Sequence, residues 1–244
     1  MSEALLEVNG LGKRFGGFVA LADIAFAVGA GERVGLIGPN GSGKTTLVNC
    51  ICGTLRHDVG TVHFAGTALD GLPAHRRTRL GLARSFQLPH PFTTLTVADN
   101  LRVPLLYATH ARGADAAAIV ERCAELLHLV GLADKARRRP RELTQIDMRK
   151  LELARAIAAE PRLLIADEAM AGLSPQEADE ILALLIRLNE QGIAIVLIEH
   201  IMRVVMQFSM RVLVLVAGRK IAEAPPEEVV RRPDVIEAYL GRQP

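Results

Sequence analysis

Residues 38–45 of the 244-residue chain read Gly38-Pro39-Asn40-Gly41-Ser42-Gly43-Lys44-Thr45, and they match the pattern G-x-x-x-x-G-K-[ST] at every fixed position. The glycines let successive backbone N–H groups point toward one anion, because no Cβ blocks its approach. The Lys44 amine can reach the β- and γ-phosphates of a nucleotide, and the Thr45 hydroxyl can bind Mg²⁺. The stretch therefore predicts a nucleotide-binding loop, to which we assign Gly38 through Thr46.

The segments on both sides of this loop have the expected character. The run Glu32–Ile37 predicts the buried strand that precedes such a loop. The run Thr46–Cys52 predicts the helix that follows, with its positive dipole end near Gly43. A chance match on a glycine-rich turn is the alternative, and this strand–loop–helix context argues against it.

Composition and charge exclude several classes of protein. Hydrophobic residues make up 50% of the chain and charged residues 23%, so the chain can bury one sizeable core and is not disordered. The net charge of +2 is too small to indicate a nucleic-acid partner. We expect the basic clusters at 76–79 and 137–139 to lie on solvated faces or at helix ends.

The sequence shows no sign of a membrane span or a disulfide framework. No apolar run approaches the ~20 residues that a membrane-spanning helix needs, and the chain starts Met1-Ser2-Glu3 rather than with a basic signal-peptide region. We therefore expect it to stay in the cytoplasm. Cys50, Cys52 and Cys123 have no metal-binding spacing, and their odd number argues against disulfides, so we expect small buried side chains.

Short apolar runs alternate with helical patterns along the chain. Runs that suit strands buried on both faces occur at 5–8, 34–37, 163–166, 193–198 and 212–216. Between Gln87 and Glu160 such runs disappear, and helical patterns dominate at 114–130 and 148–159. The predicted fold class is α/β, with a largely parallel sheet and an inserted helical subdomain.

The sequence predicts in detail how one helix begins, at Ser174. In Ser174-Pro175-Gln176-Glu177, the serine can cap the helix, the proline can take its first position and the glutamate can close a capping box.

Two predicted strands end in polar residues. The run at 163–166 leads into Asp167 and Glu168, and the run at 193–198 leads into Glu199 and His200. Because ligands gather at the carboxyl ends of parallel strands, we expect Asp167 and Glu168 beside the phosphate loop. Asp167 then suits Mg²⁺, and Glu168 is placed to orient or deprotonate an attacking water. Surface charges and a satisfied polar histidine are the alternatives for these residues.

In chain order these features resemble the ATP-binding subunit of an ABC transporter, and the resemblance covers essentially the whole chain. Three further segments carry the resemblance: Gln87 with the preceding Ala83-Arg84-Ser85-Phe86, Leu143-Thr144 before a basic helix, and Ala171-Gly172-Leu173-Ser174. On the segments 13–17, 167–173 and 233–241 the chain is most similar to the ATPase subunits of branched-chain amino acid importers.

The resemblance implies a single ABC ATPase domain over residues 1–244. Residues 1–87 and 160–244 are then a P-loop NTPase core of mainly parallel sheet flanked by helices, with antiparallel strands near the N-terminus. Residues 88–159 are a helical subdomain that carries the signature region, and residues 225–244 are a C-terminal helical tail.

The resemblance also implies roles for residues outside the loop. Phe15 matches the aromatic residue that stacks on adenine, and Gln87 matches the residue that senses Mg²⁺ and the attacking water. Asp167 matches the metal-associated acid, Glu168 the catalytic base and His200 the switch histidine. The implied catalytic residues are Lys44, Gln87, Glu168 and His200; the implied metal residues are Thr45, Gln87 and Asp167; the implied cofactors are ATP and Mg²⁺.

The family signature Leu-Ser-Gly-Gly-Gln is altered here to Leu143-Thr144-Gln145-Ile146-Asp147. In this family two ATPase subunits meet head to tail, so Thr144 is expected to contact the nucleotide held by the other subunit. Thr144 keeps a hydroxyl, but bulky residues replace both glycines and weaken a close backbone contact with phosphate. This departure favours a heterodimer, with a second ATPase subunit whose signature is intact, over a homodimer.

The resemblance implies an ATP-hydrolysing subunit of an ABC importer, bound peripherally at the cytoplasmic face of the inner membrane. It would power uptake of branched-chain amino acids or a related small amide or amino-acid-like solute. Its further partners would be membrane permease subunits and an external solute-binding protein. The alternatives are a non-transport ABC ATPase and a weakly hydrolysing regulatory subunit; the altered signature supports the second, and the intact Asp167, Glu168 and His200 oppose it.

Overall fold

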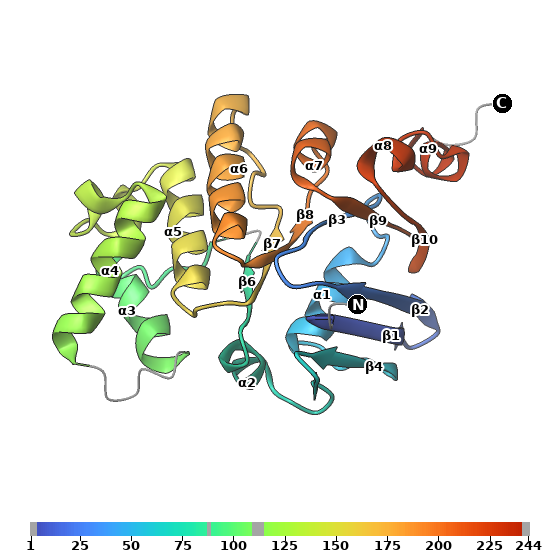
Figure 1. Cartoon of the computed structure of the whole chain (residues 1–244), viewed down its shortest axis with the longest axis horizontal. Helices are drawn as coiled ribbons and strands as arrows, with labels where there is room; N and C mark the ends of the chain where they lie inside the picture. The colour runs from blue at the N-terminus through green and yellow to red at the C-terminus, as the bar shows by residue number, and fades with distance from the viewer. Residues whose placement is uncertain (1–3, 87–88, 109–114, 241–244) are drawn as a thin grey trace.

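The computed structural model describes residues 4–86, 89–108 and 115–240, and within them the chain forms two sheets (Figure 1). The larger sheet has the strand order β10-β9-β3-β8-β7-β6. Its strands are β3 Arg33–Ile37, β6 Leu82–Ser85, β7 Leu163–Asp167, β8 Ala194–Ile198, β9 Arg211–Val216 and β10 Arg219–Ala224. Neighbours from β9 to β6 are parallel, and β10 pairs antiparallel with β9. The predicted α/β class is confirmed.

Helices cover both faces of the parallel sheet, which is why its central strands are apolar throughout. Every residue of β7 and β8 is buried. The covering helices include α1 Lys44–Cys52, α6 Pro175–Glu190 and α7 Met202–Phe208. Figure 1 shows α6 and α7 on one face and α1 on the other. Successive residues of β7 therefore enter different cores: Leu164 packs with α6, and Ile165 packs with α1.

The second sheet is antiparallel and has the strand order β2-β1-β4-β5. Its strands are β1 Leu6–Phe15, β2 Phe18–Val28, β4 Val59–Phe64 and β5 Thr67–Ala68. Apolar residues of α1 share one buried core with β1, β2, β4 and the parallel sheet, so α1 lies between the two sheets. The expected N-terminal antiparallel strands are confirmed, and the loop before α1 comes to lie where the sheets meet.

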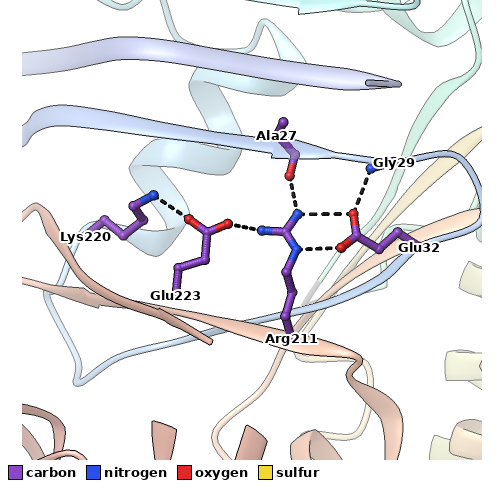
Figure 2. A network of polar contacts seen from close by, with 6 residues as sticks. All are labelled: Ala27, Gly29, Glu32, Arg211, Lys220 and Glu223. Atoms are coloured by element: carbon purple, nitrogen blue, oxygen red, sulfur yellow. Dashed lines mark hydrogen bonds and ion pairs between the residues drawn. The ribbon is translucent and has the colours of Figure 1, made fainter. Parts of the chain in front are cut away.

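An ion-pair network around Arg211 links the two sheets (Figure 2). The Arg211 guanidinium donates to both carboxylate oxygens of Glu32, to the Ala27 carbonyl and to Glu223, which also pairs with Lys220. Glu32 in turn accepts a hydrogen bond of 2.7 Å from the Gly29 amide. Since Ala27 belongs to β2 and Arg211 to β9, the network fixes the connection between β2 and β3 against the parallel sheet.

A helical region is inserted between β6 and β7, as predicted. It consists of α3 Val97–Tyr107, α4 Ala116–Val130, the short helices η1 Ala133–Lys135 and η2 Pro140–Glu142, and α5 Gln145–Ile157. The predicted start of the last helix at Met148 is wrong, because α5 begins at Gln145. Thr144 and Asp147 form a capping box that adds these three residues to the helix.

The basic cluster at 76–79 lies at the end of the helix α2 Ala74–Arg79, which is one of the two expected placements, but Arg77 does not lie on a solvated face. Its side chain is buried, and its guanidinium donates to the carbonyls of Cys50 and Ile51 near the end of α1 and to that of Leu72. Arg77 therefore satisfies carbonyl groups that the last turn of α1 leaves without intrahelical partners.

The cysteines are buried small side chains, as predicted. Cys50, Cys52 and Cys123 are free and buried, and burial raises the pKa of Cys52 to about 12. The last two elements of the described residues are α8 Pro226–Val229 and α9 Pro233–Leu240. No helix among residues 4–86, 89–108 and 115–240 combines the length and the apolar character needed to cross a bilayer.

Candidate nucleotide-binding site

The predicted phosphate loop connects β3, which ends at Ile37, to α1, which begins at Lys44. Two of its glycines are required by close backbone contacts. A Cβ on Gly38 would lie 2.1 Å from the Leu215 carbonyl oxygen, and a Cβ on Gly43 would lie 2.8 Å from the Ala20 carbonyl oxygen. Both residues also have positive φ values, 154° and 103°. The loop therefore has the tight, backbone-lined shape that the motif predicts.

Lys44 is held at the loop by the carbonyl groups beneath it. Its Nζ donates to the Gly38 carbonyl at 2.7 Å and to the Pro39 carbonyl at 3.0 Å. Burial lowers the pKa of Lys44, and the carboxylates of Glu168 and Asp167 act in the opposite direction. Lys44 and Glu168 line the same cavity, so a cation and an acid are both available there to a metal–phosphate ligand.

A pocket of about 300 Å³ opens over the loop and collects most of the predicted nucleotide-binding residues. Its lining consists of Phe15, Phe18, Ala20, Asn40, Gly41, Ser42, Gly43, Lys44, Thr45, Thr46 and Glu168. Gly38 and Pro39 lie outside this lining and contact Lys44 through their carbonyls. The structure therefore brings one aromatic face, the loop and one carboxylate to the same cavity.

Phe18 was not predicted to contribute to this pocket. It pairs with Phe15 across the turn between β1 and β2, and both rings are exposed, by 65% and 49%. Lys13 lies over the Phe15 ring, with its Nζ 5.5 Å from the ring centroid. Gly16-Gly17 between the two phenylalanines is the sequence signal that could have identified this hairpin and its pair of rings.

Asp167 is the last residue of β7, and it is paired with Arg84 of β6. Arg84 Nη2 donates to Asp167 Oδ2 at 2.5 Å, and Arg84 Nη1 donates to Asn49 Oδ1 of α1 at 2.6 Å. The Arg84 and Asp167 side chains are only 10% and 7% exposed. Sequence reasoning found Asp167 but missed Arg84 and Asn49, because neither belongs to a contiguous motif with it.

Glu168 follows Asp167 and lines the pocket. Its φ is 47°, a left-handed value that side chains disfavour, and its amide donates to the Ile198 carbonyl at 2.9 Å. Backbone strain of this kind is retained where the surrounding structure fixes it, and it clusters at functional sites. The observation agrees with the catalytic role expected for Glu168.

His200 lies at the same edge of the sheet but is not part of the pocket lining. Its side chain is 64% exposed, and its Nδ1 is 4.0 Å from Glu199 Oε2. Glu199 is buried and accepts a hydrogen bond from the Met170 amide, and burial raises the pKa of its carboxyl. Gln87, the other predicted sensor of Mg²⁺ and water, lies outside the described residues.

The altered signature forms the cap of α5. Thr144 Oγ1 accepts from the Asp147 amide at 3.3 Å, and the Asp147 carboxylate accepts from the Thr144 amide at 3.2 Å. Lys135 Nζ donates to both Asp147 oxygens at 2.8 Å. Burial raises the pKa of Asp147, but the bonds from Lys135 and Thr144 outweigh this and lower it overall. Thr144 is not part of the lining of the loop pocket.

The oxygen groups near the loop fit a magnesium ion that arrives with its nucleotide. Thr45 lines the pocket, and Asp167 ends β7, which β8 separates from the strand that leads into the loop. Within the described residues there is no group of three or more His, Cys, Asp or Glu that could hold a metal by itself. Mg²⁺ is usually bound by one or two protein oxygens together with substrate phosphates and water, so this donor set suits it.

Comparison with protein families and curated relatives gives consistent matches. The family described as ABC transporter matches residues 21–171, and the family described as branched-chain amino acid ATP-binding cassette transporter matches residues 219–243. The chain is 40% identical to the high-affinity branched-chain amino acid transport ATP-binding protein LivG of Salmonella typhimurium, over 99% of each chain. It is 37% identical to the corresponding BraF of Pseudomonas aeruginosa, also over 99% of each chain.

Solved structures show the same relationship. A nucleotide-free ATP-binding cassette of an ABC transporter matches with a TM-score of 0.88 and 30% identity, covering 98% of this chain and 100% of the other. A dimeric cassette in a post-hydrolysis state, bound to ADP and phosphate, matches with a TM-score of 0.82 and 26% identity, covering 91% and 98%.

Proposed function

The chain belongs to the ABC transporter family of ATP-binding proteins, and we propose that it is the ATP-hydrolysing subunit of an importer for branched-chain amino acids or a chemically related small solute. The observation that supports this solute class most strongly is the match over 99% of both chains to LivG and BraF. Hydrolysis is supported by the pocket itself, because Lys44 and Glu168 line the same cavity.

The residues of the pocket suit in-line attack of water on the γ-phosphorus of ATP. The loop amides and Lys44 hold the β- and γ-phosphates, and Phe15 offers an aromatic face to the adenine. Glu168 orients the attacking water and accepts its proton. Thr45 and Asp167 would hold Mg²⁺ together with the phosphates, and the ion would supply positive charge for the transition state. We assign contact with the γ-phosphate to His200, and sensing of Mg²⁺ and water to Gln87.

A groove of about 340 Å³ supports a partnership with membrane subunits. It lies between α2 and β6 of the α/β core and α3 and α5 of the helical region. Phe86, Phe92 and Tyr107 line it and are 42%, 43% and 65% exposed. Exposed aromatic side chains of this kind gather at interaction sites. We assign this groove to a permease subunit, which places the chain peripherally at the cytoplasmic face of the membrane, with an external solute-binding protein acting on the assembled complex.

The altered signature supports a heterodimer with a second ATPase subunit. The Thr144 hydroxyl already accepts a hydrogen bond from Asp147, and Ile146 stands where the family has a glycine. The nucleotide held by the second subunit would face the altered signature of this chain, so its contact with that signature is weak. The nucleotide held on Lys44 would face the intact signature of the second subunit. We expect the site on Lys44 to hydrolyse ATP quickly and the opposite site to turn over slowly.

Paired substitutions test both parts of this proposal. In the assembled transporter, Glu168→Gln in this chain should reduce ATP turnover and leucine uptake far more than the matching glutamate substitution in the second ATPase subunit. Equal losses would contradict the asymmetry. Full uptake of leucine, isoleucine and valine by a transporter carrying Lys44→Ala would contradict the proposed function itself.

A weakly hydrolysing regulatory subunit is the second candidate, favoured by the altered signature alone. It predicts that Glu168→Gln in this chain leaves ATP turnover by the complex unchanged. The curated relatives provide no support for a non-transport ATPase.

A further inference from the structure

Arg84 lies between Asp167, the acid assigned to Mg²⁺, and the groove lined by Phe86, Phe92 and Tyr107. It is the third residue of β6 and pairs in register with Ile165 of β7, so its side chain lies on the same face of the sheet as Ile165 and Asp167. This is the face that α1 covers. The long side chain can therefore reach both Asp167 at the end of β7 and Asn49 on α1.

The two ends of the Arg84 guanidinium make different contacts. Nη2 binds Asp167 and Nη1 binds Asn49, at 2.5 and 2.6 Å. Charge-assisted hydrogen bonds of this length between groups that are nearly buried are stronger and more directional than neutral ones. The ion pair uses Oδ2 of Asp167 and leaves Oδ1 outside it, so the carboxylate is fixed in one orientation without both oxygens being consumed.

The same side chain forms part of the groove. Arg84 and Phe86 both line it, and the guanidinium carbon lies 5.0 Å from the centroid of the Phe86 ring. Nε of Arg84 is buried and has no hydrogen-bond partner within the part of the chain that the structure describes. The planar guanidinium of Arg84 therefore contacts Asp167, Asn49 of α1 and the Phe86 ring of the groove.

We propose that Arg84 is a positioning residue that orients Asp167 for the magnesium ion of MgATP and transmits the state of that site to Phe86 in the groove. This inference rests on the proposed function, which assigns the groove to a membrane subunit. A movement of Phe86 displaces the guanidinium and therefore the Asp167 carboxylate. Because coupling between two sites is reciprocal, Mg²⁺ binding at Asp167 must change the free energy of the Arg84–Phe86 contact by as much as that contact changes the free energy of Mg²⁺ binding.

Arg155 provides a matched control. It lines the same groove, its guanidinium carbon lies 5.2 Å from the centroid of the Phe92 ring, and it pairs with buried Glu152 at 2.9 Å. Among the described residues its guanidinium binds Glu152 and the His90 carbonyl rather than Asp167. A substitution of Arg155 therefore removes a contact with Phe92 in the groove and an ion pair with buried Glu152, but it leaves the contacts of Asp167 unchanged.

The first experiment measures binding of a nonhydrolysable fluorescent ATP analogue with Mg²⁺ and with EDTA, on the full chain. The factor by which Mg²⁺ tightens binding should fall by about fivefold or more in Arg84→Gln, because the Asp167 carboxylate loses its charge-assisted bond. It should stay within about twofold of the original in Arg155→Gln, and binding in EDTA should change little in both variants.

Thermal unfolding without nucleotide shows whether each variant is folded. If Arg84→Gln does not fold, Arg84→Lys decides the question, since it keeps the positive charge but cannot bind Asn49 and Asp167 together. A clear loss of the Mg²⁺ effect in Arg84→Lys supports the inference, and unchanged behaviour overturns it. The same Mg²⁺ effect in Arg84→Gln and Arg155→Gln also overturns it while leaving the proposed function intact. A chain with no nucleotide binding at all would overturn both.

The second experiment observes the groove directly. The sequence contains no tryptophan, so Phe86→Trp introduces a single tryptophan beside Arg84, which can be excited selectively over the two tyrosines. Adding Mg²⁺ to the nucleotide-loaded variant should change the tryptophan emission. The change should disappear when Arg84→Gln is added and persist when Arg155→Gln is added. An unaltered response in the presence of Arg84→Gln would contradict transmission through Arg84.

Discussion

Glu168 combines a strained backbone with a place in the phosphate-loop pocket. Its amide bond to the Ile198 carbonyl ties it to β8, and Lys44 lines the same cavity. The neighbouring strand therefore fixes the backbone of Glu168 at the edge of the pocket before substrate arrives. Such preorganisation is what a general base for water requires.

Glu168→Gln should separate binding from chemistry. The glutamine keeps the size and polarity of the side chain but cannot accept the proton, so ATP turnover should fall by about 10²–10⁴-fold. The affinity for MgATP should remain close to that of the unchanged chain. Steady-state phosphate release and equilibrium titration measure the two quantities, with Glu180→Gln on α6 as a control for loss of an acid. Retained turnover would show that another group activates the water.

The contiguous residues of the site could be predicted from sequence, and the others could not. Residues 38–46, Asp167 and Glu168 follow from motifs that fix both residue type and spacing. Arg84 carries no such signal, since its partners Asn49 and Asp167 are 35 and 83 residues away. Phe18 was missed for a related reason. An aromatic residue in a strand can equally well belong to the hydrophobic core, and only the hairpin register shows that Phe18 lies beside Phe15.

Helix caps explain where several helices begin. The predicted capping box of α6 is present: the Ser174 amide donates to Glu177 at 2.9 Å, and the Glu177 amide donates to the Ser174 hydroxyl at 3.3 Å. The capping box of α5 was not predicted, because the residues 143–147 were interpreted through their likeness to the family signature. Local hydrogen bonding there extends the helix to Gln145.

Ser174→Ala should destabilise the chain by about 1 kcal/mol, since it removes a side-chain acceptor from the first turn of α6. Ser174→Asp supplies another good cap and should retain most of the stability. Urea denaturation of the two variants provides the comparison. Equal stability of the alanine variant and the unchanged chain would show that the cap contributes nothing.

The arrangement of the two sheets was predicted unevenly. Four of the five apolar runs became strands of the sheet that helices cover on both faces, and such double burial leaves a strong sequence signal. The run at 5–8 became part of β1 in the antiparallel sheet. The antiparallel sheet was expected only from the family resemblance, since half-exposed strands such as β4 carry mixed patterns. The Arg211 network, which links residues 179 positions apart in the case of Glu32, has no local signal at all.

The Arg211 network makes stability depend on pH. Burial raises the pKa of Glu32, but the bonds from Arg211 and Gly29 outweigh it, so the folded value lies below the ordinary one. The contribution is therefore complete above the unfolded pKa of about 4.3 and is lost as the pH falls through the folded pKa.

Glu32→Gln should accordingly destabilise the chain at neutral pH by about 1 kcal/mol, because solvent screens part of the interaction. The difference from the unchanged chain should shrink as the pH falls below about 4.3. Denaturant titrations at several pH values test this, with Glu190→Gln at the end of α6 as a control. A difference that stays constant with pH would assign the effect to packing rather than to charge.

Calorimetric titration of MgATP into the folded full chain tests the central claim most directly. The structure predicts a saturable heat of binding to one site per chain, which is lost in Lys44→Ala and retained in Lys150→Ala, a lysine outside the pocket. Absence of binding heat in the unchanged chain, or equal binding in Lys44→Ala, would contradict the assignment of this pocket to ATP.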